Sequence, residues 1–374
     1  MSSVAAPDAL TVVVTLAAPF EPFLLLLDAL SAPILPKHIH DRPGFALDPQ
    51  QYPPIGTGPF RHAEWLRLVR FEGYAGPKPA PGAVALDEIV FSILPDPAAR
   101  VAALQTGRPV LMAVDAVDFA AIPRLREEHG LVLAGETTPN QAALAWLEVN
   151  HRAKPLGDAK VRQALAAAID RAALLRDVWL GLGQVATSPV ASGTRYHDPK
   201  AQLPPYDPRA ASALLTAAGL RPDDDGVRAH IHHLVRPGQP WESLAAALRV
   251  ALGEVGIDLV LEPVDADAWT RRIATGAYET TGMVAEQRAD PALDIAQFYL
   301  ANTAGYANPA VDALLAQAGT PDVRRAAFAE AQKRLIDDMA QIWLVEPALP
   351  VIRDPRVVTP NGVYGSFDDV TWRS

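Results

Sequence analysis

The chain has 374 residues, of which 49% are hydrophobic and 20% are charged, a composition typical of a globular protein with a sizeable core. Its net charge of −10 and its lack of a lysine and arginine cluster do not suit a nucleic-acid surface, so we expect no nucleic-acid partner. The absence of cysteine excludes disulfide frameworks, thiolate metal sites and thiol nucleophiles.

Strand and helix patterns follow one another from the beginning of the chain. Short β-branched or alternating apolar segments predict strands at residues 11–16, 65–72 and 86–94. An apolar segment at residues 20–30 predicts a helix. Another helix follows the third strand, because Asp96 can cap it, Pro97 suits its first turn and Gly107 suits its exit.

The same alternation continues through the middle of the chain. Asp158 can cap a helix predicted over residues 158–171, which carries apolar residues at helical spacing on one face. Residues 242–254 predict a helix that Gly256 ends, and residues 257–261 predict the strand after it. Alternating helices and strands predict an α/β fold.

Several sequence patterns occur in a fixed order over most of the chain. Two of them are Gly56-Thr-Gly-Pro59 and the helix Val161-Arg-Gln-Ala-Leu-Ala-Ala-Ala-Ile-Asp-Arg171. The others are Thr11–Phe23 with Ile34–His38, Leu86–Gly107, Tyr306–Asp312 and Gly362–Trp372. In this order the segments resemble the family 5 extracellular solute-binding proteins, which include the peptide-, nickel- and sugar-capturing receptors of ABC importers.

The resemblance implies a two-lobed periplasmic-binding-protein-like fold (type II, cluster C-like) with a hinge. Residues 1–54 would be the remnant of a small extra domain of lobe I. Residues 55–139 would form lobe I, residues 140–347 lobe II, and residues 348–374 a return to lobe I. Crossing strands near residues 141–150 and 345–352 would be the hinge between the lobes.

The start of the chain departs from the family pattern. Family members carry a signal peptide and a further stretch before the strand that begins at Thr11, and we expect the fold to be N-terminally truncated. The first basic residue is Lys37, so no basic region precedes an apolar core as a signal peptide requires. The resemblance nevertheless implies a periplasmic or extracytoplasmic location.

Arg236 is the first candidate ligand-binding residue. It lies in Leu234-Val-Arg-Pro-Gly-Gln-Pro-Trp241, between a predicted strand and a predicted helix. Dipeptide-binding members of the family carry a similar Arg-Pro segment, and the resemblance implies that this arginine receives the ligand carboxylate. A guanidinium suits the role because it binds a carboxylate through two parallel hydrogen bonds. The alternative is a solvated loop arginine.

Gln287 and Glu286 are candidates for the other end of a ligand. Peptide-binding relatives anchor the ligand ammonium with an aspartate three residues before an Asp-Pro pair, and Asp290-Pro291 places Gln287 at that position. A neutral amide is a weak ammonium partner, so the neighbouring Glu286 is the alternative anchor. The alternative, judged from its turn-forming residues alone, is a capped surface loop in which Asp290-Pro291 opens a helix.

Trp241 and Trp146 are candidate walls of the ligand pocket, because such clefts are lined mainly by apolar and aromatic side chains. For Trp146, a core position in the hinge strand is the favoured alternative. Tyr299 and Tyr306 are weaker candidates.

Neither a metal nor a cofactor is predicted. His230 and His232 would share a strand face, and imidazole is a common metal ligand, but no further ligand can be named from elsewhere in the chain. An exposed strand is therefore the favoured interpretation. No pattern of an activated nucleophile is recognised, so we do not expect an enzyme.

The resemblance implies the solute-binding component of an ABC importer. It would capture a small polar ligand, peptide-like or other, in the cleft between its lobes and deliver it to the permease subunits, and we expect it to act as a monomer. The alternatives are a cytoplasmic ligand-sensing domain of a transcriptional regulator, or an inactive fragment.

Overall fold

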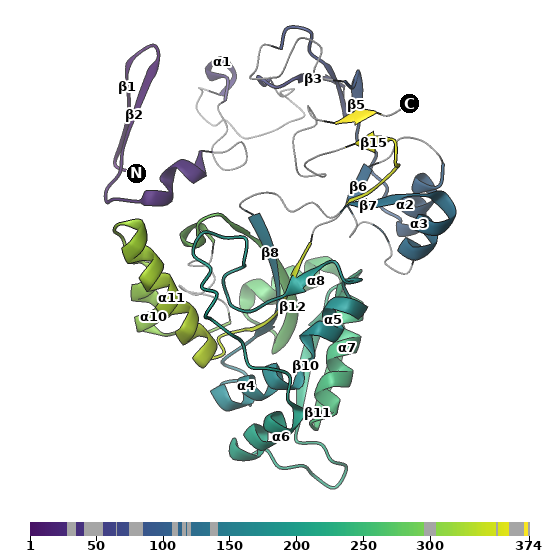
Figure 1. The fold of residues 1–374 in the computed structure, drawn as a ribbon, viewed down its shortest axis with the longest axis vertical. Coiled ribbons are helices and arrows are strands. Elements are labelled where there is room, and N and C mark those ends of the chain that lie inside the picture. Colours follow the sequence, from purple (N-terminus) through teal and green to yellow (C-terminus); the bar gives the residue numbers. More distant parts are fainter. Residues whose placement is uncertain are drawn as a thin grey trace. The chain divides into compact units, whose positions relative to one another are not determined.

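The computed structural model describes residues 1–27, 35–40, 55–64, 66–74, 85–106, 111–113, 117, 121–134, 141–294, 304–348, 351–358 and 370–372. The chain divides into two compact units, which are described separately (Figure 1). The large unit comprises Met1–Leu27 and Pro139–Pro347, and the small unit comprises Asp28–Thr138 and Ala348–Ser374. The assignment of lobe I to residues 55–139, of lobe II to residues 140–347 and of residues 1–54 to a domain remnant stays a prediction.

A six-stranded sheet forms the centre of the large unit, in the order β11-β10-β12-β8-β13-β9. Its strands are β8 (Gln141–Val149), β9 (Gly183–Val185), β10 (Ala229–Val235), β11 (Ile257–Pro263), β12 (Thr280–Arg288) and β13 (Ile342–Pro347). β10 runs parallel to β11 and β12, whereas β8 is antiparallel to β12 and β13. β13 is buried throughout, as expected for an interior strand covered on both faces.

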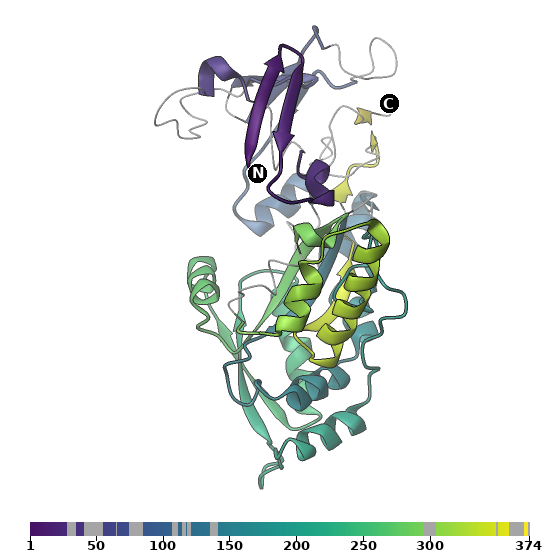
Figure 2. The ribbon, with the colours of Figure 1, turned by 90° about the vertical axis from the view of Figure 1, so that its left-hand side faces the viewer.

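Helices pack against this sheet and lie between its strands in the sequence. They are α4 (Ala159–Ala168), α5 (Arg171–Asp177), α6 (Pro208–Ala217), α7 (Trp241–Gly253), α8 (Ala266–Thr275), η4 (Pro291–Leu293), α10 (Pro309–Leu315) and α11 (Pro321–Asp337). Figures 1 and 2 show α10 and α11 side by side. The mixture of helices and strands confirms the predicted α/β class.

The helix predicted over residues 158–171 is two helices. Asp158 caps α4 as expected, but Ile169 is extended (φ −101°, ψ 115°). The carboxylate of Asp170 then accepts hydrogen bonds from the backbone N–H groups of Ala172 and Ala173 and begins α5. A second cap inside the pattern therefore ends the first helix, because an aspartate side chain competes with helical hydrogen bonding.

The helices α7 and α8 lie on opposite faces of the sheet. A side chain added at Gly282 of β12 would point at Trp241 and Leu244 of α7. The neighbouring Thr281 accepts a hydrogen bond from the indole N–H of Trp269 in α8. Successive strand residues point to opposite faces, so these two contacts place one helix on each side of the carboxyl end of β10.

The first 27 residues belong to the large unit. Strands β1 (Ser3–Asp8) and β2 (Thr11–Thr15) form an antiparallel hairpin, drawn in purple in Figure 2, and β2 confirms the predicted strand. Within the predicted helix at residues 20–30, Glu21–Leu26 form the 3-10 helix η1, and residues 28–30 lie outside the described part of the chain. Nearly all side chains of the hairpin are exposed.

The small unit contains short strands and helices. Its strands are β3 (Phe60–Glu64), β4 (Arg67–Arg70), β5 (Glu88–Val90), β6 (Leu111–Ala113), β7 (Val132–Ala134), β14 (Val351–Arg353), β15 (Val357–Val358) and β16 (Thr371–Trp372), and its helices are α1 (Lys37–His40), α2 (Pro97–Leu104) and α3 (Ile122–His129). Asp96 caps α2 as predicted, through a hydrogen bond from the N–H of Ala98. Trp65, Gly107 and residues 359–369 lie outside the described residues. Throughout the described part of the chain, every helix is too short or too polar to span a membrane.

Candidate ligand-binding site

Arg236 lies at the carboxyl end of β10, where the chain leaves the sheet and turns into α7. Its guanidinium carbon is 3.5 Å from the ring centroid of Trp241 and 5.1 Å from that of Trp269. The side chain is half-buried. Arg236 therefore lies between two indole rings that come from helices on opposite faces of the sheet, an arrangement we call the arginine clamp.

Both rings of the arginine clamp are held in place by the sheet. Trp241 is 8% exposed and packs over Gly282, where an added Cβ would lie 3.0 Å from the Trp241 ring. The indole N–H of Trp269 donates to the hydroxyl of Thr281 at 3.0 Å, and that hydroxyl donates to the carbonyl of Leu234 at 2.8 Å. The guanidinium is thus oriented before any ligand binds.

This geometry suits recognition of an anion at the end of the parallel strands. Indole faces attract a guanidinium and hold its plane. A guanidinium held in one plane is suited to bind a carboxylate through two parallel hydrogen bonds. In open α/β sheets, ligands bind beyond the carboxyl ends of parallel strands. The structure brings two of the sequence candidates, Arg236 and Trp241, together in the clamp.

Replacing Gly282 by alanine is expected to lower the free energy of unfolding by about 1–3 kcal/mol, because the new methyl group overpacks the contact with Trp241 and Leu244. Thermal unfolding and tryptophan fluorescence would measure this change. Gly253→Ala is the matched control, because nothing lies within 4 Å of the Cβ added there. Equal stability of the two variants would contradict the proposed support of Trp241.

Gln287 is buried, and both ends of its amide are engaged. Its Oε1 accepts from the N–H of Ala191 at 2.8 Å, and its Nε2 donates to the carbonyl of Pro189 at 2.9 Å. The side chain is 5% exposed. Gln287 therefore ties a loop to β12, and these contacts leave little of the amide for a ligand.

Glu286 is exposed on the opposite face of β12, together with Val284, which is 36% exposed. Of the two candidate ammonium anchors, the structure presents Glu286 to solvent and buries Gln287.

Trp146 lies in the centre of the sheet and not at its edge. It is 3% exposed, and its indole N–H donates to the carboxylate of Glu148, two residues along β8. Gln341 donates to the same oxygen of Glu148 at 2.7 Å. Burial raises the pKa of Glu148 to about 7, although hydrogen bonds from Trp146 and Tyr278 oppose this shift. These contacts favour the core interpretation of Trp146.

The remaining candidates have structural contacts. His230 pairs with Asp258 at 2.7 Å and His232 with Glu262 at 2.5 Å on the exposed side of β10. Tyr306 is 8% exposed and donates to Asp338 at 2.7 Å. Tyr299 lies outside the described residues. Where the structure describes the chain, no group of three or more His, Asp and Glu side chains is arranged to bind a metal.

Trp269 is the site residue that sequence reasoning missed. It follows β11 within α8, and its segment carries no motif that separates it from an ordinary helix residue. The sequence signal that could have identified Trp269 is its position after a predicted strand. In a parallel sheet, the segments that follow neighbouring strands lie at the same end of the sheet, which is where Arg236 lies.

The sequence of this chain is similar to those of known bacterial proteins. Residues 1–306 match the profile of the bacterial extracellular solute-binding proteins, family 5 Middle. The dipeptide-binding protein of Escherichia coli K12 is 30% identical over 291 residues, which cover 76% of this chain and 52% of the relative. The glutathione-binding protein GsiB of Pectobacterium atrosepticum is 28% identical over 375 residues, covering 95% of this chain and 69% of the relative. The chain thus spans about half the length of the Escherichia coli relative.

The fold matches that of the ABC transporter-associated periplasmic binding protein DppA from Helicobacter pylori, solved in complex with the peptide STSA. The TM-score is 0.79 at 23% identity, and the match covers 100% of this chain and 74% of the other. This likeness confirms the predicted two-lobed periplasmic-binding-protein-like class of fold.

Proposed function

The chain belongs to the family 5 bacterial extracellular solute-binding proteins, and we propose that it captures a small polar ligand for an ABC importer. Members of this family bind solutes and are not enzymes. The named relatives bind a dipeptide, glutathione and a peptide, respectively. We propose a ligand of the same kind, a short peptide or peptide-like molecule with a free carboxylate.

The arginine clamp is the observation that carries this proposal. Peptides share a terminal carboxylate whatever their side chains, and Arg236 presents an oriented guanidinium at the edge of the sheet. The two indoles provide apolar area beside it, which is the usual composition of a small-molecule site.

The ligand's ammonium group would bind Glu286. Leu234 is aligned with Thr281 in the parallel pair of β10 and β12, so continuing the register places Arg236 level with Met283. Glu286 lies three residues farther along β12, about 10 Å at ~3.3 Å per residue. An extended peptide of two or three residues spans about 7–10 Å, which suits simultaneous contact with Arg236 and Glu286.

Replacing Glu286 by glutamine is expected to weaken peptide binding about tenfold, because a charged partner of the ammonium becomes neutral. Isothermal titration with a dipeptide and a tripeptide would measure the effect. A ligand with an acetylated amino terminus should bind both proteins equally. If Glu286→Gln binds the free peptide as tightly as wild type does, Glu286 is not the anchor.

The remaining parts of the proposed function follow from the family. The partners would be the permease subunits of an ABC importer, and the location would be periplasmic or extracytoplasmic. We propose a monomer with no nucleic-acid partner. The assignment of lobe I to residues 55–139 and of lobe II to residues 140–347 belongs to the same proposal, with the hinge near residues 141–150 and 345–352.

A binding screen tests this function directly. Purified protein would be titrated with dipeptides, tripeptides, glutathione, oligosaccharides and metal chelates, and saturable binding of the peptide group alone is the expected result. The regulator alternative gains no support from the named relatives. An inactive fragment would show no saturable binding and no cooperative thermal transition, which distinguishes it from a folded receptor with another ligand.

A further inference from the structure

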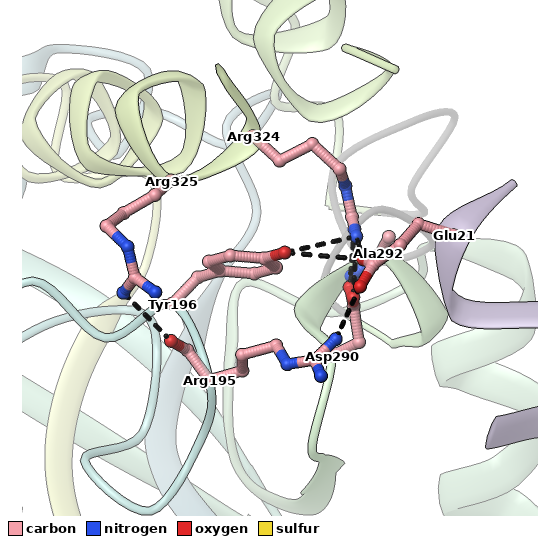
Figure 3. Close-up of polar contacts among 7 residues, drawn as sticks. All are labelled: Glu21, Arg195, Tyr196, Asp290, Ala292, Arg324 and Arg325. Carbon is pink, nitrogen blue, oxygen red and sulfur yellow. Dashed lines mark hydrogen bonds and ion pairs between the residues drawn. The ribbon is translucent and has the colours of Figure 1, made fainter. Parts of the chain in front are cut away.

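A carboxylate from the N-terminal segment lies among donors from distant parts of the large unit. Arg195 donates to Oε1 of Glu21 at 2.6 Å, and the hydroxyl of Tyr196 donates to Oε2 at 3.3 Å. Nη1 of Arg324 also donates to Oε2. Both oxygens of Glu21 are therefore bound, as Figure 3 shows, and we call these residues together with Asp290 the Glu21 cluster.

Two of the three donors, Arg324 and Tyr196, are held by contacts that do not involve Glu21. Arg324 is 3% exposed and forms two hydrogen bonds to the fully buried Asp290, at 2.6 and 2.7 Å. The ring of Tyr196 stacks on Phe328 with centroids 5.3 Å apart and an interplanar angle of 2°. Arg195 donates its backbone N–H to the carbonyl of Ala289 at 2.8 Å. Arg324, Tyr196 and Asp290 are thus buried and oriented, whereas the side chain of Arg195 is 48% exposed at the rim of the cluster.

Without Glu21 the cluster would carry a net positive charge. The Arg324–Asp290 pair is neutral by itself, so Arg195 adds a positive charge that Glu21 balances. A planar, singly charged carboxylate fits these donors, because Arg195 binds one of its oxygens while Arg324 and the hydroxyl of Tyr196 bind the other. A phosphate dianion would lie close to the carboxylate of Asp290, which disfavours it.

The contact is also the polar attachment of the N-terminal segment. Among the described residues, every hydrogen bond and ion pair that joins residues 1–27 to residues 139–347 is made by Glu21. A cavity of about 410 Å³ lies beside it, lined by residues 19–22 on one side and by Ala292, Arg324 and residues 315–319 on the other. The described polar contacts of the segment are thus confined to Glu21, beside a cavity of a size that a small molecule could enter.

We propose that Arg195, Tyr196 and Arg324 form a carboxylate-binding site on the large unit, that Glu21 occupies this site as an internal ligand, and that a small free carboxylate binds there when the Glu21 side chain is removed or displaced. Residues 1–27 are then a strap whose attachment competes with soluble carboxylates. The site is separate from the arginine clamp, and its test needs no knowledge of the transported solute.

Chemical rescue tests the proposal. In Glu21→Ala, amide hydrogen exchange of residues 1–27 is expected to accelerate about tenfold or more, because charge-assisted hydrogen bonds hold the strap. Sodium formate should then raise the melting temperature of the variant in a saturable manner, relative to sodium chloride at equal ionic strength. Binding of ¹³C-formate, followed by NMR line broadening, gives a second readout that a merely structural ion pair would not produce.

Three comparisons decide the outcome. The double variant Glu21→Ala/Arg195→Ala should lose the formate response, because one of the donors is gone. Glu330→Ala removes a carboxylate from a surface ion pair with Arg334 on α11 and should show no formate response. In the wild-type protein, high formate should accelerate exchange in residues 1–27 where chloride does not, which keeps the test available if Glu21→Ala fails to fold. An equal response of the single and double variants, or none in the single variant and the wild type, overturns the proposal.

Discussion

Replacing Arg236 by alanine is expected to lower the affinity for a peptide ligand by about 30-fold or more. The guanidinium carbon lies 3.5 Å from the Trp241 ring centroid, so the fork is oriented and partly desolvated before the ligand arrives. Removing one partner of such a charged pair costs about 2 kcal/mol or more, and 1.4 kcal/mol corresponds to a factor of ten in affinity. Isothermal titration with a peptide that the wild-type protein binds measures the loss.

Two controls separate recognition of the carboxylate from general damage. Arg236→Lys keeps the charge but loses the planar fork, so intermediate affinity is expected. A peptide with an amidated carboxyl terminus should bind wild type and Arg236→Ala equally weakly. If Arg236→Ala retains full affinity for the free peptide, the arginine clamp is not the ligand site.

Replacing Glu148 by glutamine is expected to stabilise the protein at pH 8 by up to about 3 kcal/mol. Burial raises the pKa of this carboxyl from 4.5 to about 7 in the folded state. Its contribution to stability is therefore fully present below pH 4.5 and is lost as the pH rises through 7, where the folded protein must ionise a buried group. A shift of this size corresponds to roughly 3 kcal/mol at 1.36 kcal/mol per pKa unit. Urea unfolding at pH 5 and pH 8 measures the change.

The hydrogen bonds of Glu148 permit this substitution. Trp146 and Gln341 donate to the same oxygen, so the carbonyl oxygen of a glutamine can accept both, and the hydroxyl of Tyr278, which also bonds Glu148, can either donate or accept a hydrogen bond. Glu346 is the contrasting control, because it accepts from Ser192 through one oxygen and from Ser192 and Gln184 through the other. Glu346→Gln should destabilise at both pH values. If the stability of Glu148→Gln keeps the pH dependence of wild type between pH 5 and 8, Glu148 does not titrate there.

Local signals in the sequence were sufficient for much of the fold. The cap at Asp158, the exit at Gly256 and the alternation of β11 each depend on neighbouring residues, and the structure has them where the pattern places them. The break at Ile169 was missed because Asp170 is compatible with two structures. It could be an exposed residue of one continuous helix or the N-cap of a second helix. Packing against other elements decides between such states, and a single sequence does not contain that information directly.

The candidate site was predicted only in part for a related reason. Arg236 and Trp241 are close in the chain, so one loop carries both. Trp269 reaches the same guanidinium from another helix, and its role depends on how β10, β11 and β12 are ordered in the sheet. The engagement of Gln287 depends on a loop almost a hundred residues earlier in the chain. Contacts of this range are set by topology and leave no periodic trace in the sequence.

The immobilised guanidinium of Arg236 has a consequence for selectivity. An arginine side chain ordinarily gives up about 2 kcal/mol of rotamer freedom when it is fixed, and stacking between two indoles removes most of that freedom in advance. If the proposed function holds, affinity would then derive chiefly from a group that all peptides share. We expect such a receptor to distinguish solutes by the chemistry of their termini and to tolerate wide variation between them.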